Sequence, residues 1–262
     1  MAEGNKSKRW NSISFADGCK VIRVGSWQGF NDLFYEKLIN LRHFIWRGHT
    51  DSDWPLEPTL DRILNVILPE NRGKAREDHL ERFRMAARGR RGPFPSKPTE
   101  DELWSLGRHY GLATPFLDWT RSPFVAAFFA LIEQNTSSRF RAVWGLTSNV
   151  LHRSDEIRKE HKGVSRAPII EFIDPKVDDN PRLVSQGGLF TRSPDGVDIQ
   201  NWVSTYFKDD KKTRLFKILI PDSERELALR ALNRMNINHL SLFPDLTGAC
   251  EYANSNLLIA EY

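Results

Sequence analysis

The residues of this 262-residue chain that could carry chemistry fall in three short segments, and the first surrounds Arg47. Arg47 stands between Trp46 and Gly48 at the end of a short apolar stretch. From a strand end, a guanidinium can hold a phosphate or a carboxylate by two parallel hydrogen bonds. Alternatively, Arg47 pairs with Asp51 or Asp53 and only fastens the loop that follows.

The second segment carries His109, Tyr110, Asp118, Trp119 and Thr120 within a dozen residues. A histidine, an aspartate and a threonine could form an acid and base relay. Alternatively, Asp118 and Thr120 bind turn amides ahead of the next helix, while His109 and Tyr110 form hydrogen bonds inside the core.

The third segment is centred on Gln186, which is followed by Gly187 and Gly188. Glycines permit unusual backbone angles and a close approach, so the carboxamide could lean over a ligand. A plain turn explains the glycines equally well. We therefore keep Gln186 as a candidate site residue beside Arg47 and Thr120.

Several common catalytic motifs are absent from the sequence. It contains no Walker A sequence, no GxGxxG after a strand, no HExxH and no GxSxG, and no histidine lies at zinc-ligand spacing with a cysteine. The sequence therefore argues against a P-loop NTPase, a Rossmann dehydrogenase and a zinc enzyme, and we expect no metal site.

Positive charge is concentrated in residues 72–92. This stretch holds eight Lys or Arg against three acidic residues, an excess larger than the net charge of +4 of the whole chain. Such a concentration attracts polyanions such as RNA, DNA or nucleotide phosphates. We expect it to bind nucleic acid through Arg84, Arg88, Arg90 and Arg91. The alternative is a solvated helix face.

The composition, with 40% apolar and 11% aromatic residues, is that of a globular protein. The longest apolar run, 124–132, is too short to cross a bilayer, and the first ten residues lack the apolar core of a signal peptide. Cys19 and Cys250 are the only cysteines and lie far apart. We expect no membrane association, no disulfide framework and a cytoplasmic location.

The hydrophobic pattern predicts a single compact α+β domain over residues 18–262, after a flexible N-terminal tail over residues 1–17. Strands are predicted at 20–24, 43–48, 141–147, 168–173 and 214–220. Helices are predicted at 27–39, 60–68, 74–88, 99–106, 123–134 and 223–235. The segment 174–210 is predicted to be irregular apart from a short strand at 188–191.

Three of these helices have clear start signals. Their predicted caps are Ser26, Thr99 with Glu102, and Ser122 with Pro123. The helix at 123–134 is apolar on every face, so we expect it to be buried nearly all round.

The three segments resemble the FRG domain family, which is named for an aromatic, Arg, Gly start that here reads Trp46, Arg47, Gly48. The resemblance continues through WPLEPTL, HYGLATPFLDWTRSPFVAAFFA, QGGLFT and LSLFPDLTG, from about Val21 to Gly248. The stretch from HYGL to FFA is the most specific part.

A more distant resemblance is to ADP-ribosyltransferases, in which a Ser-Thr-Ser strand precedes a proline-started helix. It implies a split sheet surrounded by helices, with Arg47 holding NAD, Thr120 at the hydroxyl position and Gln186 as the third catalytic residue. His109 joins the catalytic candidates. The expected NAD contacts are Arg47, Trp46, Tyr110, Asp118 and Trp119. The sequence departs from that family in reading Asp-Trp-Thr and in lacking a final Glu motif.

Two hypotheses follow. The first is an NAD-dependent ADP-ribosyltransferase, a bacterial toxin or phage-defence effector that uses NAD as co-substrate and modifies nucleic acid or protein, with an antitoxin or other regulatory protein as partner. The alternative is a non-catalytic module that binds nucleic acid through the basic stretch.

Overall fold

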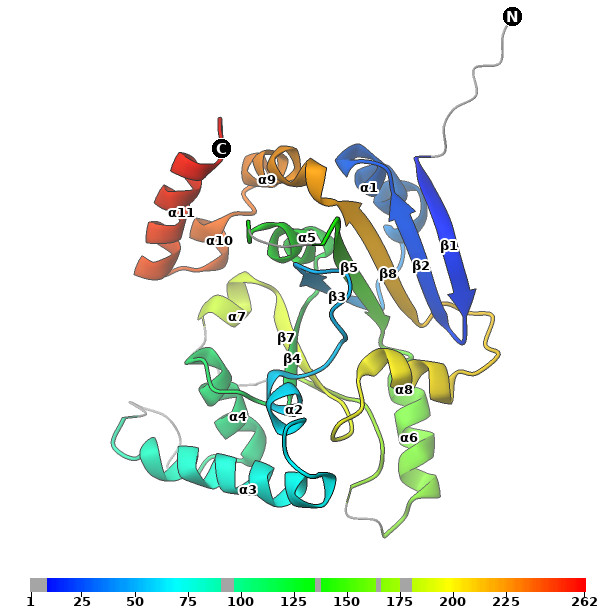
Figure 1. The fold of residues 1–262 in the computed structure, drawn as a ribbon, viewed down its shortest axis with the longest axis vertical. Helices are drawn as coiled ribbons and strands as arrows, with labels where there is room; N and C mark the ends of the chain where they lie inside the picture. Colours follow the sequence, from blue (N-terminus) through cyan, green and yellow to red (C-terminus); the bar gives the residue numbers. More distant parts are fainter. Residues whose placement is uncertain (1–8, 91–96, 135–137, 164–165, 175–180) are drawn as a thin grey trace, which may run out of the picture.

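Eight strands form one mixed sheet in the order β1-β2-β8-β5-β3-β4-β7-β6 (Figure 1). The computed structural model describes residues 9–90, 97–134, 138–163, 166–174 and 181–262. The strands are β1 Trp10–Ala16, β2 Cys19–Val24, β3 Phe44–His49, β4 Phe116–Thr120, β5 Phe140–Thr147, β6 Glu171–Ile173, β7 Gly188–Arg192 and β8 Leu215–Pro221. The predicted single compact α+β domain is confirmed.

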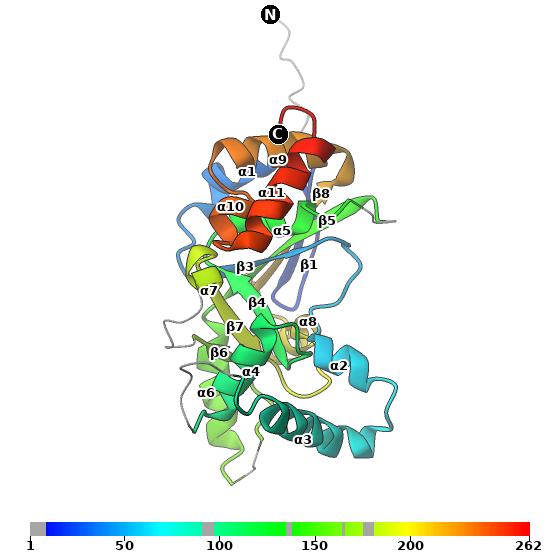
Figure 2. The same cartoon turned by 90° about the vertical axis from the view of Figure 1, so that its left-hand side faces the viewer.

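The strand pairing within the sheet is shortest between β3 and β4. These antiparallel strands share one registered pair, Trp46 with Thr120, whereas β3 pairs with β5 along its whole length and β4 does the same with β7. In Figure 2, β4 and β7 lie at an angle to β3. The sheet is continuous, so the split expected from the more distant resemblance is present only as this single-pair junction.

The N-terminal residues differ from the expected tail. Trp10–Ala16 form β1, which pairs with β2, while residues 1–8 lie outside the described part of the chain. Asp17 and Gly18 have φ of 48° and 73°, the left-handed values that a two-residue hairpin turn requires. The Asp-Gly pair was therefore the signal for this hairpin, and the polar residues of β1 resemble a tail because most of the strand is exposed.

Helices cover both faces of the sheet. They are α1 Trp27–Leu33, α2 Thr59–Leu64, α3 Pro69–Ala86, α4 Glu100–His109, α5 Pro123–Leu131, α6 Val150–Glu160, α7 Pro181–Ser185, α8 Ile199–Tyr206, α9 Arg225–Arg234, α10 His239–Leu242 and α11 Leu246–Leu258. A π-helical turn, Phe34–Leu38, continues α1, and a 3₁₀ turn, Asp222–Glu224, precedes α9. Among the described residues, none of these helices has the length and apolarity needed to span a membrane.

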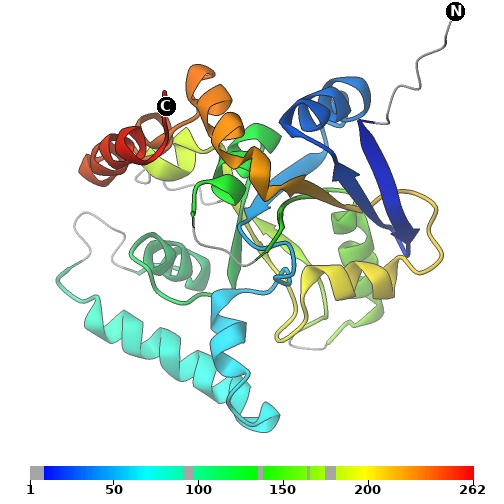
Figure 3. The same ribbon diagram turned by 45° about the horizontal axis from the view of Figure 1, so that its top comes forward.

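Three apolar clusters hold the layers together. The first joins α1, α5 and α9 to one face of the sheet, the second joins α6 and α8 to the other face, and the third places α2, α3 and α4 against Phe116 and Phe190. In Figure 3 the cyan and teal helices α2–α4 stand apart from the orange and red helices α9–α11. The junction of β3 and β4 lies between these two groups.

The predicted helix caps are confirmed at all three sites. Ser26 accepts from the Gly29 amide, Thr99 and Glu102 form a capping box, and Ser122 accepts from the Val125 amide. Helix α5 is buried nearly all round, as its composition predicted.

The segment 174–210 is more regular than expected. It contains α7 and α8 as well as the predicted strand β7. The signal for α8 was present, because Asp198 caps the Asn201 amide and Ile199, Trp202 and Val203 recur on one face. Helices α6, α10 and α11 were not predicted either.

Gly48 lets β3 lie against α5 without a gap. A Cβ at this position would overlap the Ala126 carbonyl oxygen and the Ala130 nitrogen, whereas a Cβ at Gly73 on α3 would meet nothing within 4 Å. We therefore expect Gly48→Ala to destabilise the fold by about 1 to 3 kcal/mol. Gly73→Ala, the matched control, should stabilise it by up to about 1 kcal/mol because alanine favours helix. Urea unfolding of both variants checks the opposite signs, and equal effects would contradict this packing.

Candidate functional site

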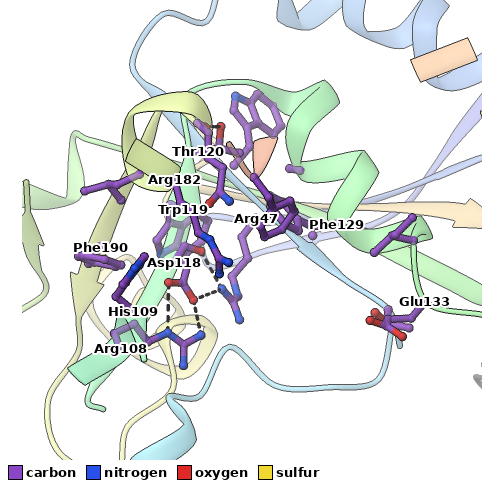
Figure 4. A pocket seen from close by; sticks show the side chains of 18 of the residues that line it. Arg47, Arg108, His109, Asp118, Trp119, Thr120, Phe129, Glu133, Arg182 and Phe190 are labelled. Atoms are coloured by element: carbon purple, nitrogen blue, oxygen red, sulfur yellow. Dashed lines mark hydrogen bonds and ion pairs between the residues drawn. The ribbon is translucent and has the colours of Figure 1, made fainter. Parts of the chain in front are cut away.

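The three chemistry-bearing segments meet at one cavity of about 580 Å³ (Figure 4). Its base lies at the β3–β4 junction, and its walls come from α5, α7 and the end of α4. The sequence-predicted residues that line it are Trp46, Arg47, His109, Asp118, Trp119, Thr120 and Gln186. Segments remote along the chain are therefore brought together.

Arg47 is held at the point where β3 and β4 separate. Its Nη1 donates to the Asp118 carbonyl oxygen at 2.7 Å and lies 3.6 Å from Asp118 Oδ2. Burial lowers the pKa of the Arg47 guanidinium to about 10, against the opposing effect of Asp118, so it stays cationic at neutral pH. Its ionic partner is thus Asp118 rather than Asp51 or Asp53.

Asp118 also binds Arg108, on the last turn of α4. Arg108 Nε donates to Oδ1 at 3.2 Å and its Nη2 donates to Oδ2, which makes the pair bidentate (Figure 4). Burial alone would raise the pKa of the Asp118 carboxyl, but Arg108 and then Arg47 lower it below its ordinary value. Two guanidiniums therefore share one carboxylate, and this corner of the cavity keeps a positive charge that suits an anion.

The side chains of Thr120 and Gln186 both donate hydrogen bonds to backbone carbonyl oxygens. Thr120 Oγ1 donates to the Gln186 carbonyl oxygen at 2.6 Å and accepts from the Ser122 amide, while Gln186 Nε2 donates to the Leu242 carbonyl oxygen at 3.1 Å. Gly187 has φ of 55°, so the turn after Gln186 uses the freedom of glycine. Both side chains line the cavity, but these contacts hold its wall together.

His109 faces the cavity, whereas its neighbour Tyr110 faces the solvent. His109 lines the cavity, and burial together with the nearby Arg182 lowers the pKa of its imidazole, which leaves it neutral at physiological pH. Tyr110 is 77% exposed, is absent from the cavity lining and meets His109 edge to face. The alternative that Tyr110 forms hydrogen bonds inside the core is therefore wrong, whereas its contact with the cofactor stays a prediction.

Phenylalanines that the sequence analysis did not single out add to the aromatic lining of the cavity. The indoles of Trp46 and Trp119 are buried in the two large apolar clusters, and Trp119 Nε1 donates to Thr191. Phe129 and Phe243 line the cavity and are only partly buried.

The sequence analysis also missed two arginines that line the cavity. Arg108 and Arg182 contribute guanidiniums, and Arg182 is held by Asp245 Oδ2 at 2.5 Å while lying over the Phe243 ring. Their partners are fixed by tertiary contacts, so only the position of Arg108 beside His109 offered a signal.

The basic stretch lies away from the cavity, mainly on α3. Arg84, Arg88 and Arg90 are exposed, whereas Arg91 lies outside the described residues. Arg84 pairs with Glu81, and Arg90 donates to the Ala86 carbonyl oxygen. Arg76, from the same stretch, is buried against Asp61, so part of the charge is structural.

No group of three or more His, Cys, Asp or Glu side chains in the described part of the chain could hold a metal ion. Cys19 and Cys250 are free thiols.

The shared carboxylate predicts the effect of Asp118→Asn. The change leaves Arg47 and Arg108 facing each other without a counter-charge, and we expect it to lower the free energy of unfolding by about 1 to 3 kcal/mol at pH 7. The expected loss of stability is smaller than for a fully buried ion pair, because the Asp118 side chain is 42% exposed. Denaturant unfolding measures it.

The same effect should depend on pH. The folded-state pKa of Asp118 lies below its ordinary value of 3.8, so its stabilisation is complete well above that value and is lost as pH falls through the folded pKa. The gap between wild type and Asp118→Asn should therefore narrow below about pH 4. Glu81→Gln, which breaks an exposed pair with Arg84, is the control and should cost under about 0.5 kcal/mol. Equal losses in both variants would contradict the assignment.

Comparison with known proteins gives one match. The FRG domain family model matches residues 42–139, a span that includes Arg47, His109, Asp118 and Thr120 but not Gln186. No curated protein and no solved structure matches the chain significantly. The match covers less of the chain than the span from Val21 to Gly248 that the resemblance predicted. Residues 42–139 are therefore an FRG domain.

Proposed function

We propose that this protein is an NAD-dependent ADP-ribosyltransferase that modifies a nucleic acid or a protein. The observation that carries the proposal is the convergence of Arg47, Asp118, Thr120, His109 and Gln186 on one cavity. As a toxin or phage-defence effector, it would act on cytoplasmic NAD and need an antitoxin or other regulatory protein.

The size and charge of the cavity support a dinucleotide. Its volume of about 580 Å³ falls in the range of small-molecule and cofactor sites. The guanidinium of Arg47 suits a diphosphate, because its planar fork matches the spacing of phosphate oxygens. Phe129 and Phe243 offer apolar ring faces to the nicotinamide or the adenine.

The proposed reaction breaks the bond between the ribose C1′ and the nicotinamide nitrogen. Nicotinamide leaves with the bonding electron pair, the acceptor nucleophile forms the new bond to C1′, and the acceptor proton passes to His109. A neutral imidazole can accept that proton, and the lowered pKa of His109 keeps it neutral. Asp118, which pairs with both Arg108 and Arg47, holds the two guanidiniums at the corner that would take the diphosphate.

The proposal gives Thr120 and Gln186 a different task from the one expected by resemblance. Their hydrogen bonds tie β4, the turn before β7 and Leu242 into one wall. They thereby position the cavity rather than carry the proton transfer.

Incubation with labelled NAD tests the proposal. NAD should raise the melting temperature of the wild-type protein, and nicotinamide should be released as label moves to an acceptor. Arg47→Ala should lower kcat/KM for NAD at least about tenfold, since it removes charge-assisted hydrogen bonds. Arg84→Ala is the matched control and should leave turnover unchanged. Neither a thermal shift nor nicotinamide release with the wild type would reject the proposal.

A second candidate function is a nucleic-acid-binding module, favoured by the exposed arginines Arg84 and Arg88 on α3 and beside its end. On this hypothesis, affinity for single-stranded DNA or RNA should fall steeply with salt. Each of Arg84→Ala and Arg88→Ala should reduce the salt slope by about one, whereas Arg47→Ala should not. Fluorescence anisotropy at several salt concentrations measures this. Affinity that stays constant over a tenfold change in salt would exclude it.

A further inference from the structure

His49 follows Arg47 by two residues on β3 and is 5% exposed. Side chains two apart on a strand lie on the same side, so His49 and Arg47 are neighbours by geometry. Its ring meets the rings of Trp54 and Trp144 edge to face, at centroid distances of 6.3 and 6.2 Å. The imidazole is therefore confined by packing.

The imidazole binds the side of Arg47 that faces away from Asp118. Arg47 Nε donates to His49 Nε2 at 3.0 Å. An imidazole nitrogen can accept only when it carries no proton, so His49 must be neutral with its proton on Nδ1. Burial and the adjacent Arg47 charge lower the pKa of His49 to about 2, and the Trp54 backbone offsets only part of this.

Two anchors then fix the plane of the guanidinium. Nε is held by His49, and Nη1 is held by the Asp118 carbonyl oxygen. A guanidinium has five N–H donors, so about three are left for a ligand in the cavity. A donor group that is already oriented loses less conformational entropy when an anion binds.

We propose that His49 is a positioning residue, whose buried imidazole orients the Arg47 guanidinium toward the phosphates of a nucleotide in the cavity. It does not line the cavity and acts through Arg47. The identity of the ligand as NAD rests on the proposed function, but the orientation of Arg47 applies to any diphosphate.

The groups around His49 predict how binding responds to pH. The three charges with the largest effect on it are cationic: Arg47 on β3, Arg62 on α2 and Lys217 on β8. Each of them opposes protonation of the imidazole. The affinity of the wild type for NAD, whose diphosphate diester stays ionised over this range, should therefore change less than threefold between pH 5.5 and pH 8. A decline in affinity as pH falls through about 6.5, the ordinary pKa of histidine, would overturn the proposal.

Two variants separate orientation from packing. His49→Phe keeps a ring but removes the acceptor, and it should raise the KM for NAD about tenfold or more with kcat within threefold of wild type. His49→Gln restores an acceptor oxygen and should bring KM back to within threefold. His79→Phe is the control, because His79 also packs against a tryptophan, Trp104, but its Nε2 bonds the Ala113 carbonyl oxygen and not Arg47. An unchanged KM in His49→Phe would overturn the proposal.

Titration calorimetry with inorganic pyrophosphate makes this test independent of the reaction. If NAD does not bind the wild type but pyrophosphate does, the proposed function fails, and the ratio of pyrophosphate affinities between wild type and His49→Phe still decides the role of His49. If neither ligand binds the wild type, Arg47 is not an anion clamp and both proposals are rejected. If His49→Phe does not fold, the pH profile of NAD binding by the wild type remains decisive.

Discussion

The hydrogen bond from Arg47 to the backbone of Asp118 determines much of this structure. Past the single pair of Trp46 with Thr120, the antiparallel register would bring Gly48 opposite Asp118, but the two strands have already separated. The Asp118 carbonyl oxygen then accepts from the Arg47 guanidinium instead of from a strand amide. A side chain thus replaces a sheet hydrogen bond, and the cation is fixed where the strands open.

Packing on either side keeps that opening in place. Gly48 allows α5 to rest directly on β3, and the α2–α4 group packs against Phe116 on β4. The two strands are therefore anchored to different helix groups, while β5 and β7 hold their other edges. The cavity is a consequence of this arrangement, because it lies between α5 on one side and the end of α4 on the other.

Elements with local signals could be predicted from the sequence, and those without could not. The caps at Ser26, Thr99 and Ser122 act within three residues, so the helix starts were predicted correctly. Strand β1 was missed because its mostly exposed residues carry little hydrophobic pattern. The same reason applies to α11, where few residues are buried.

The same distinction between local and tertiary signals applies to the candidate site. The grouping of Arg47, Asp118 and Thr120 was predicted through a family resemblance rather than from spacing. The Arg108–Asp118 pair and the His49 contact depend on how α4 and β3 are placed in three dimensions. The exposure of Tyr110 could not be predicted, because an aromatic residue beside a glycine has no local mark of it.

The extent of the FRG match has a consequence for how this segment can be inherited. Residues 42–139 contain β3 and β4, whose main strand partners, β5 and β7, both come later in the chain. Excised by itself, the segment would hold two strands joined by one pair and would leave an apolar edge of each without a partner. The unit that is recognised by sequence is thus smaller than the unit that can fold autonomously, and a protein that acquires it must also supply the flanking strands.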